Sequence, residues 1–126
     1  MMNWTVAGSV LMALAVACGA FGAHGLRARL DAYSMSVYEK AVFYHFVHAL
    51  GILCIAILAR TNAITISGAN RTAWLLLLGI LVFSGSLYAL AVTGVRILGA
   101  ITPIGGVAFI AGWLLLAYEA VRAQRL

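Results

Sequence analysis

Four long apolar runs fill most of this 126-residue chain and constrain its fold more than any other feature. They cover residues 4–23, 41–59, 73–93 and 101–118. A helix needs about 20 mostly apolar residues to cross about 30 Å of hydrocarbon, because each residue adds about 1.5 Å. We therefore predict four membrane-spanning helices. Residues 1–5 contain no Lys or Arg, so we expect the first run to be a retained span rather than a cleaved signal peptide.

The composition agrees with an all-α membrane protein. Only eleven residues are charged, 65% are hydrophobic, and the mean hydropathy is +1.09. The apolar residues are contiguous rather than alternating, which favours helices over a β-barrel, and backbone polar groups in lipid must be satisfied within such elements. We predict one transmembrane domain, residues 1–126, folded as an up-down-up-down four-helix bundle. Little chain remains outside the spans, so we expect no enzyme activity.

The positive charge is dispersed over the two membrane faces. In the predicted topology, side A holds both termini and residues 60–72, and side B holds residues 24–40 and 94–100. The formal net charge is +5, and the cations stand at helix ends without forming a run, which indicates contact with membrane lipids rather than nucleic acid. Each side carries four Lys or Arg residues, and this tie leaves the orientation undecided. Side A has Arg60, Arg71, Arg122 and Arg125; side B has Arg27, Arg29, Lys40 and Arg96.

Small residues recur at helical spacing in the first, third and fourth runs. Apolar side chains gain nothing by leaving lipid, so helices in membranes associate through close backbone approach at such residues. We predict that they pack the four helices together; the same faces would alternatively form a subunit interface. The predicted packing glycines are Gly19, Gly22, Gly85, Gly105, Gly106 and Gly112.

Most intramembrane polar side chains fall in the half of the bilayer next to side B. Polar groups are costly in hydrocarbon and normally face the bundle interior, where they pair or line a cavity. We therefore predict a shared polar chamber that opens toward side B. Its predicted lining is His24, Tyr44, His48, Ser84, Ser86, Tyr88 and Thr102.

Two histidines of the second run lie one helical turn apart. With His24, His45 and His48 have a spacing that could ligate a metal or a haem iron. No Cys or carboxylate occurs at a matching depth, so we expect hydrogen bonds to Ser, Tyr or backbone groups instead, with no metal and no cofactor. A proton relay through the same side chains is a further hypothesis, because histidine titrates near neutral pH.

Two acidic residues have cationic neighbours in the sequence. Glu39 precedes Lys40, and Glu119 stands one turn before Arg122. We interpret both as interfacial ion pairs, which contribute little to stability when exposed.

Trp113 and the two cysteines have depths that constrain their roles. Trp113 falls near mid-bilayer, where its indole N–H needs a partner, and we expect it to pack against the first or third helix. Cys18 and Cys54 should differ in depth by about 13 Å, too far for a disulfide. We expect both thiols to be buried packing groups.

Short motifs in all four runs resemble a known family. They are GAFGAHG at 19–25, Tyr44 and His48, FSGSLY at 83–88, ITPIGG at 101–106, and Gly112 with Trp113. The chain resembles the small bacterial membrane proteins of the YgdD and YwdK type, a family of unknown function that is similar to eukaryotic transmembrane protein 256. The resemblance implies a multi-pass protein of the bacterial inner membrane, without an established activity, cofactor or transported substrate. It marks Gly19, Gly22, His24, Tyr44, His48, Ser84, Gly85, Tyr88, Pro103 and Gly106, while His45 departs from the pattern.

The main functional hypothesis is a small structural or accessory membrane component without catalytic activity. It would act as a homo-oligomer or within a larger membrane complex. A second hypothesis is an oligomeric channel or transporter for a proton or small solute, lined by the predicted polar chamber. A third is a redox subunit associated with haem or quinone.

Overall fold

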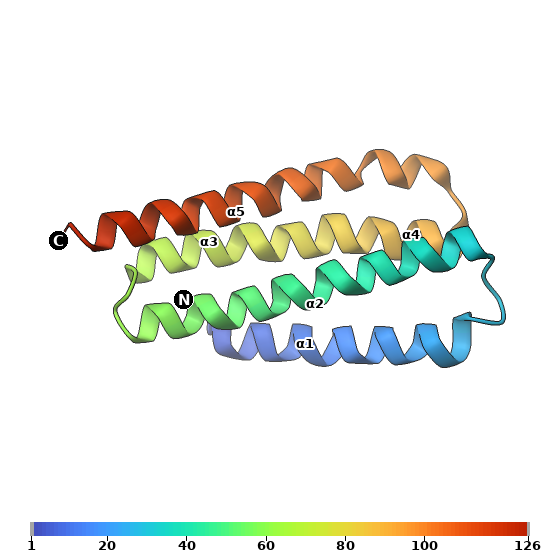
Figure 1. The fold of residues 1–126 in the computed structure, drawn as a ribbon, viewed down its shortest axis with the longest axis horizontal. Coiled ribbons are helices and arrows are strands. Elements are labelled where there is room, and N and C mark those ends of the chain that lie inside the picture. The colour runs from blue at the N-terminus through green and yellow to red at the C-terminus, as the bar shows by residue number, and fades with distance from the viewer. Residues whose placement is uncertain (1, 126) are drawn as a thin grey trace.

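Four antiparallel helical rods make up the computed structural model, which describes residues 2–125 (Figure 1). Both chain ends lie at the same end of the bundle, as predicted. Each rod is long and apolar enough to cross a membrane, and no strand occurs among these residues. The rods are α1 (Trp4–Phe21) with the π-helical turn η1 (Gly22–Leu26); α2 (Ala32–Arg60); α3 (Ile66–Gly79), the π-helical turn η2 (Ile80–Ser84) and α4 (Gly85–Thr93); and the 3₁₀ turn η3 (Arg96–Ala100) with α5 (Thr102–Ala123).

The second, third and fourth rods are longer than the apolar runs predicted. The α2 helix begins at Ala32 because Asp31 caps it: the carboxylate accepts a hydrogen bond from the Ser34 N–H at 2.7 Å. That bond to the backbone N–H lowers the pKa of Asp31 from its usual 3.8. The Thr65 hydroxyl caps α3 by accepting from the Gly68 N–H at 3.0 Å. These polar caps extend the helices beyond the hydrocarbon and into the headgroup layers.

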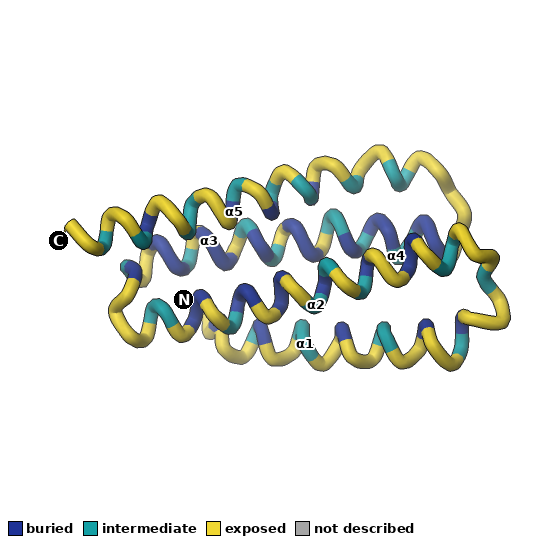
Figure 2. Tube along the Cα trace, in the orientation of Figure 1, coloured by how far each residue is buried: buried dark blue, intermediate teal, exposed yellow. Residues whose placement is uncertain are grey.

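The four rods are unequally buried. The α1 helix packs chiefly against α2, and α5 packs chiefly against α3 and η2, so α2 and the third rod occupy the middle. In the most apolar part of each rod, 17% of the first and 22% of the fourth are buried, against 44% for each of the middle two. Figure 2 shows the corresponding long exposed stretches on α1 and α5. The outer two rods therefore present most of their apolar surface to lipid.

Two apolar clusters hold the middle rods together. One, toward side A, is built on the fully buried Ile52, Ile55 and Leu76; the other, toward side B, contains Leu87 and Leu90. Of the two free cysteines, Cys18 packs against the side B cluster. Cys18 is half-buried and Cys54 is exposed, so the expectation that both thiols are buried is wrong for Cys54, which lies on the outer face of α2.

Three predicted packing glycines stand where helices approach closely. At Gly105 a side chain would collide with the backbone of Phe83, so α5 lies directly on η2. At Gly22 it would collide with the ring of Tyr38. At Gly112 it would meet a leucine of α3. Glycine is needed at these positions because a methyl group would push the helices apart.

The other predicted packing glycines make looser contacts. A Cβ at Gly19 or Gly106 would meet its nearest neighbour at 3.5 and 3.7 Å respectively, which is ordinary van der Waals contact. The prediction for Gly85 is wrong, because nothing lies within 4 Å of that position. Ser84 and Ser86, on either side of Gly85, are the residues whose side chains are buried there. Close contacts that the sequence analysis missed occur at Gly8, Gly51, Gly68 and Gly79.

Candidate functional site

His48 lies at the centre of an aromatic cluster between α2 and α5. It is 5% exposed, and its ring stacks on Phe109 with the centroids 3.5 Å apart. The indole Nε1 of Trp113 lies 3.1 Å from Nε2 of His48, and Nδ1 of His48 lies 2.7 Å from the Tyr44 carbonyl oxygen. Trp113 therefore packs against the second helix, which the expectation of packing against the first or third helix did not include.

These two hydrogen bonds determine the tautomer of His48. An indole N–H can only donate, so Nε2 of His48 must accept, and Nδ1 must carry the proton that is donated to the carbonyl oxygen of Tyr44. The imidazole is consequently neutral, with both nitrogens paired. The Nε2 lone pair that would bind a metal or take up a proton is already used by Trp113.

His45 has a different environment, although it lies only one turn away. It is also 5% exposed, and its Nδ1 lies 2.9 Å from the Tyr88 hydroxyl on α4. Its Nε2 is a buried atom that lacks a hydrogen-bond partner within the described residues. The ring of Tyr88 also packs edge-on against Tyr38, whose hydroxyl donates to the Cys18 carbonyl oxygen at 2.5 Å. His45, rather than His48, is therefore the interior histidine with unused hydrogen-bonding capacity.

The hydroxyl groups of the third rod point to two different neighbours. Ser84 is fully buried and donates to the Ala41 carbonyl oxygen on α2 at 2.9 Å. Ser86 lies 2.6 Å from the Thr102 hydroxyl at the start of α5. Residues two positions apart on a helix face in nearly opposite directions, so these serines join separate helix pairs.

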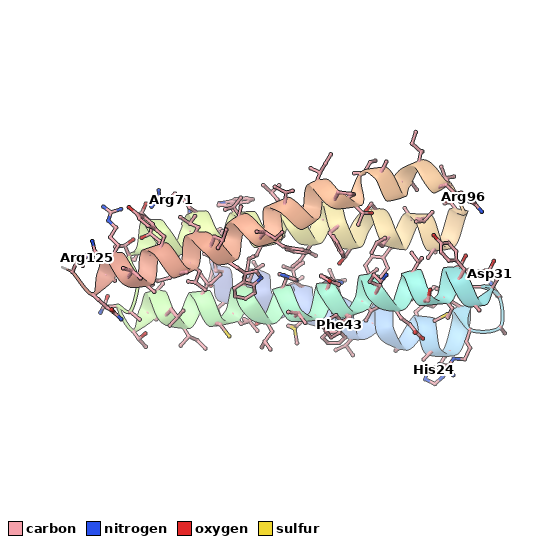
Figure 3. The ribbon with its side chains drawn as sticks, turned by 45° about the horizontal axis from the view of Figure 1, so that its top comes forward. His24, Asp31, Phe43, Arg71, Arg96 and Arg125 are labelled. Carbon is pink, nitrogen blue, oxygen red and sulfur yellow. The ribbon has the colours of Figure 1, made fainter. Side chains whose placement is uncertain are left out.

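His24 does not lie with the other predicted chamber residues. It is exposed, and its side chain points away from the bundle (Figure 3). The reason is the helical phase: Gly22 faces Tyr38 on α2, and a residue two positions later points to the opposite side of the helix. The prediction that His24 lines the chamber is wrong, and a His24–His48 site is excluded by this placement.

The remaining predicted chamber residues form separate pairs, one within α2 and the others between helices. The structure brings His48 and Tyr44 together near α5, places Tyr88 against His45, and joins Ser86 to Thr102. In the part of the chain that is described, no three His, Cys, Asp or Glu side chains form a group that could hold a metal ion. The geometry indicates a bundle interior in which pairs of polar groups form hydrogen bonds and thereby connect the helices.

A second polar cluster, at side A, was missed by sequence analysis. Glu119 on α5 is 0% exposed, and its Oε1 lies 2.6 Å from Nη2 of Arg71 on α3. The other oxygen, Oε2, accepts from the Thr65 hydroxyl at 3.3 Å. The expected pairing of Glu119 with Arg122 is wrong, because the missing side chain at Gly68 leaves room for the carboxylate to turn inward against α3.

The fold and this interior define a small multi-pass membrane protein whose polar groups mainly connect its own helices. Comparison with known proteins identifies the family. Residues 18–106 match the family described as "Protein of unknown function (DUF423)". The chain belongs to this family, as its sequence motifs predicted.

Several relatives match over nearly the whole chain. A UPF0382 membrane protein of Staphylococcus haemolyticus is 51% identical, covering 92% of this chain and 93% of its own. Another, from Staphylococcus saprophyticus, is 52% identical, covering 92% of this chain and 94% of its own. The UPF0382 membrane protein YwdK of Bacillus subtilis is 44% identical, covering 97% and 98%. No solved structure gives a significant match.

Proposed function

We propose that this protein is a non-catalytic accessory component of the bacterial cytoplasmic membrane, where it associates with another integral membrane protein. One observation carries the proposal: His48, at the centre of the aromatic cluster, has both ring nitrogens engaged, Nε2 with Trp113 on α5 and Nδ1 with the Tyr44 carbonyl oxygen of its own helix. Histidines that act in catalysis or proton transfer need a free nitrogen that a substrate or water can reach, and the Nε2 of His45, unpaired among residues 2–125, is a buried atom. The bacterial relatives support a bacterial membrane, and apolar helical bundles are typical of the cytoplasmic one, since outer-membrane proteins are barrels.

The shortness of the loops limits where a partner can bind. Only residues 27–31, 61–65 and 94–95 lie between the helical rods. A partner must therefore be recognised mainly within the bilayer. The outer face of α1 supports such recognition because it carries exposed small residues, Ser9, Ala13 and Ala17, which allow close approach of another helix.

Proximity cross-linking in cells, followed by mild purification, tests this proposal. A photo-reactive amino acid at Ala13 should capture one reproducible membrane protein. The same probe at Ile110, an exposed residue of α5, is the matched control and should capture lipid or nothing. Capture of this chain itself at Ala13 would change the partner to a second copy. A bare protein that conducts a solute in liposomes would contradict the accessory role.

A further inference from the structure

A pocket of about 380 Å³ opens between α2, the third rod and the start of α5, near side B. Its walls are mostly apolar and include Val37, Phe83, Leu87 and Pro103. The polar groups that line it are few, and Lys40 is the cation among them. Concave, mainly apolar pockets of 300–1,000 Å³ with a small number of polar groups are typical ligand sites.

Lys40 has no carboxylate partner in the part of the chain that the structure describes. Glu39, the expected partner, faces a different pocket on the other side of α2, together with Arg27. Among residues 2–125 the salt bridge is that between Arg71 and Glu119, at the opposite end of the bundle. The predicted Glu39–Lys40 ion pair is therefore wrong, because neighbouring residues on a helix point about 100° apart. Lys40 leaves a positive charge at the pocket that calls for an anion from outside the chain.

The depth of Lys40 matches that of lipid phosphates. Lys40 and Arg60 are both exposed on α2 and stand twenty residues apart, which corresponds to about 30 Å along the helix. The hydrocarbon layer is also about 30 Å thick. With Arg60 at the side A boundary, Lys40 lies at the side B boundary, where its ammonium can reach the headgroup layer while its stem stays against apolar atoms.

We propose that this pocket binds one anionic phospholipid, with the phosphate at Lys40 and part of an acyl chain against the apolar wall. A small soluble anion would leave that wall unfilled, and a zwitterionic lipid would bring a cation of its own beside the phosphate, so that the positive charge of Lys40 would remain in excess. The adjoining pocket shares Tyr33, Val37 and Leu90 and contains Asp31 and Arg96, one charge of each sign. Across the two adjoining pockets, the positive charge in excess is therefore that of Lys40. The site is independent of any protein partner.

Native mass spectrometry of the full chain tests the site. The protein is released from discs of equimolar phosphatidylcholine and phosphatidylglycerol, and the retained lipid is counted. The wild type and Lys40→Arg should retain phosphatidylglycerol preferentially, whereas Lys40→Gln should lower that retention about fivefold. Arg29→Gln removes one cation from the same side but outside the pocket, so it should have no effect. Equal retention in Lys40→Gln, or an equal loss in Arg29→Gln, would overturn the proposal.

A second variant tests the pocket without touching the charge. Gly99 lines it, and a Cβ there would make only ordinary contact with Leu90, at 3.5 Å. Gly99→Leu should fold, as judged by an unchanged thermal midpoint, but should occupy the pocket and reduce phosphatidylglycerol retention. Undiminished retention in a folded Gly99→Leu protein would show that the lipid binds elsewhere.

Discussion

Trp113 on α5 donates its indole N–H to Nε2 of His48 on α2 across 3.1 Å. This bond and the one to the Tyr44 carbonyl oxygen hold the imidazole in a single neutral form. A histidine inside a membrane protein is ordinarily a candidate for proton transfer or ligand binding. Here His48 connects α2 and α5, which otherwise meet through apolar side chains. It is therefore a packing residue that stabilises the helix pair through a hydrogen bond.

Replacing Trp113 by Phe should destabilise the bundle. The ring volume is partly kept, but Nε2 of His48 loses its donor, and interhelical hydrogen bonds in membranes contribute about 0.5–2 kcal/mol. We expect the free energy of unfolding, measured in mild detergent, to fall by that amount. Trp74→Phe is the control, because Trp74 is as exposed as Trp113, at 41% against 40%, but its indole N–H makes no side-chain hydrogen bond among residues 2–125. The double variant His48→Leu/Trp113→Phe should be less destabilised than the sum of its single changes; strict additivity would show that the two residues do not interact.

Two adjacent glycines of α5 should respond oppositely to alanine. Gly105→Ala places a methyl group against the Phe83 backbone, and such overpacking costs about 1–3 kcal/mol. Gly106→Ala meets only a ring edge at 3.7 Å, so the higher helix propensity of alanine should leave stability unchanged or slightly improved. Thermal unfolding of both variants checks this. Equal stability of the two would mean that α5 does not lie on η2 as described.

Removing the cation from the side A cluster should be more harmful than removing both charges. Arg71→Gln leaves the fully buried Glu119 carboxylate without its counter-charge, and we expect a loss of about 1–3 kcal/mol. The loss should be near the lower end because the Arg71 side chain is 53% exposed and solvent screens the pair. The double variant Arg71→Gln/Glu119→Gln should recover part of it. If Arg71→Gln left the free energy of unfolding unchanged, the Arg71–Glu119 pair would not be a stabilising contact.

The start of α2 should loosen in acid. The pKa of Asp31 is lowered by the Ser34 N–H, so its contribution to stability is complete above the usual value near 3.8 and is lost as the pH falls through the lowered one. Hydrogen exchange of the Ser34 amide, corrected for its intrinsic pH dependence, should therefore accelerate at low pH. Asp31→Asn should abolish this dependence while keeping the cap. An unchanged pH response in that variant would assign it to another group.

Most of the fold could be predicted from the sequence because lipid allows few alternatives. Four apolar runs of spanning length impose four helices, and short loops impose their antiparallel order. The helix ends were predicted less well, since α2 begins at Ala32, nine residues before its apolar run. Polar residues such as Ser34 and Ser36 are compatible with a loop or with a helix in the headgroup layer, and composition alone does not distinguish these.

For the candidate site, the sequence allowed a prediction of how deep each side chain lies along its helix, but not of which partner it contacts. Depth follows from counting residues along a helix, which is why His48 and Ser84 were found in the interior. Partners depend on helix rotation, and an error of two residues reverses the direction of a side chain, as it did for His24. The Glu119–Arg71 contact joins residues 48 positions apart; the available sequence signal was a glycine, Gly68, one turn before Arg71.

The ¹⁵N spectrum of His48 in lipid bilayers tests most directly whether this histidine is a neutral packing residue. Nε2 accepts from Trp113 and Nδ1 donates to a carbonyl oxygen, so the spectrum should show a neutral ring protonated at Nδ1 and unchanged between mildly acidic and neutral pH. Trp113→Phe should alter that signal, while Trp74→Phe should not. A ring protonated at Nε2, or one that takes up a second proton in this range, would contradict the assignment of His48 as a packing residue and favour a role in chemistry.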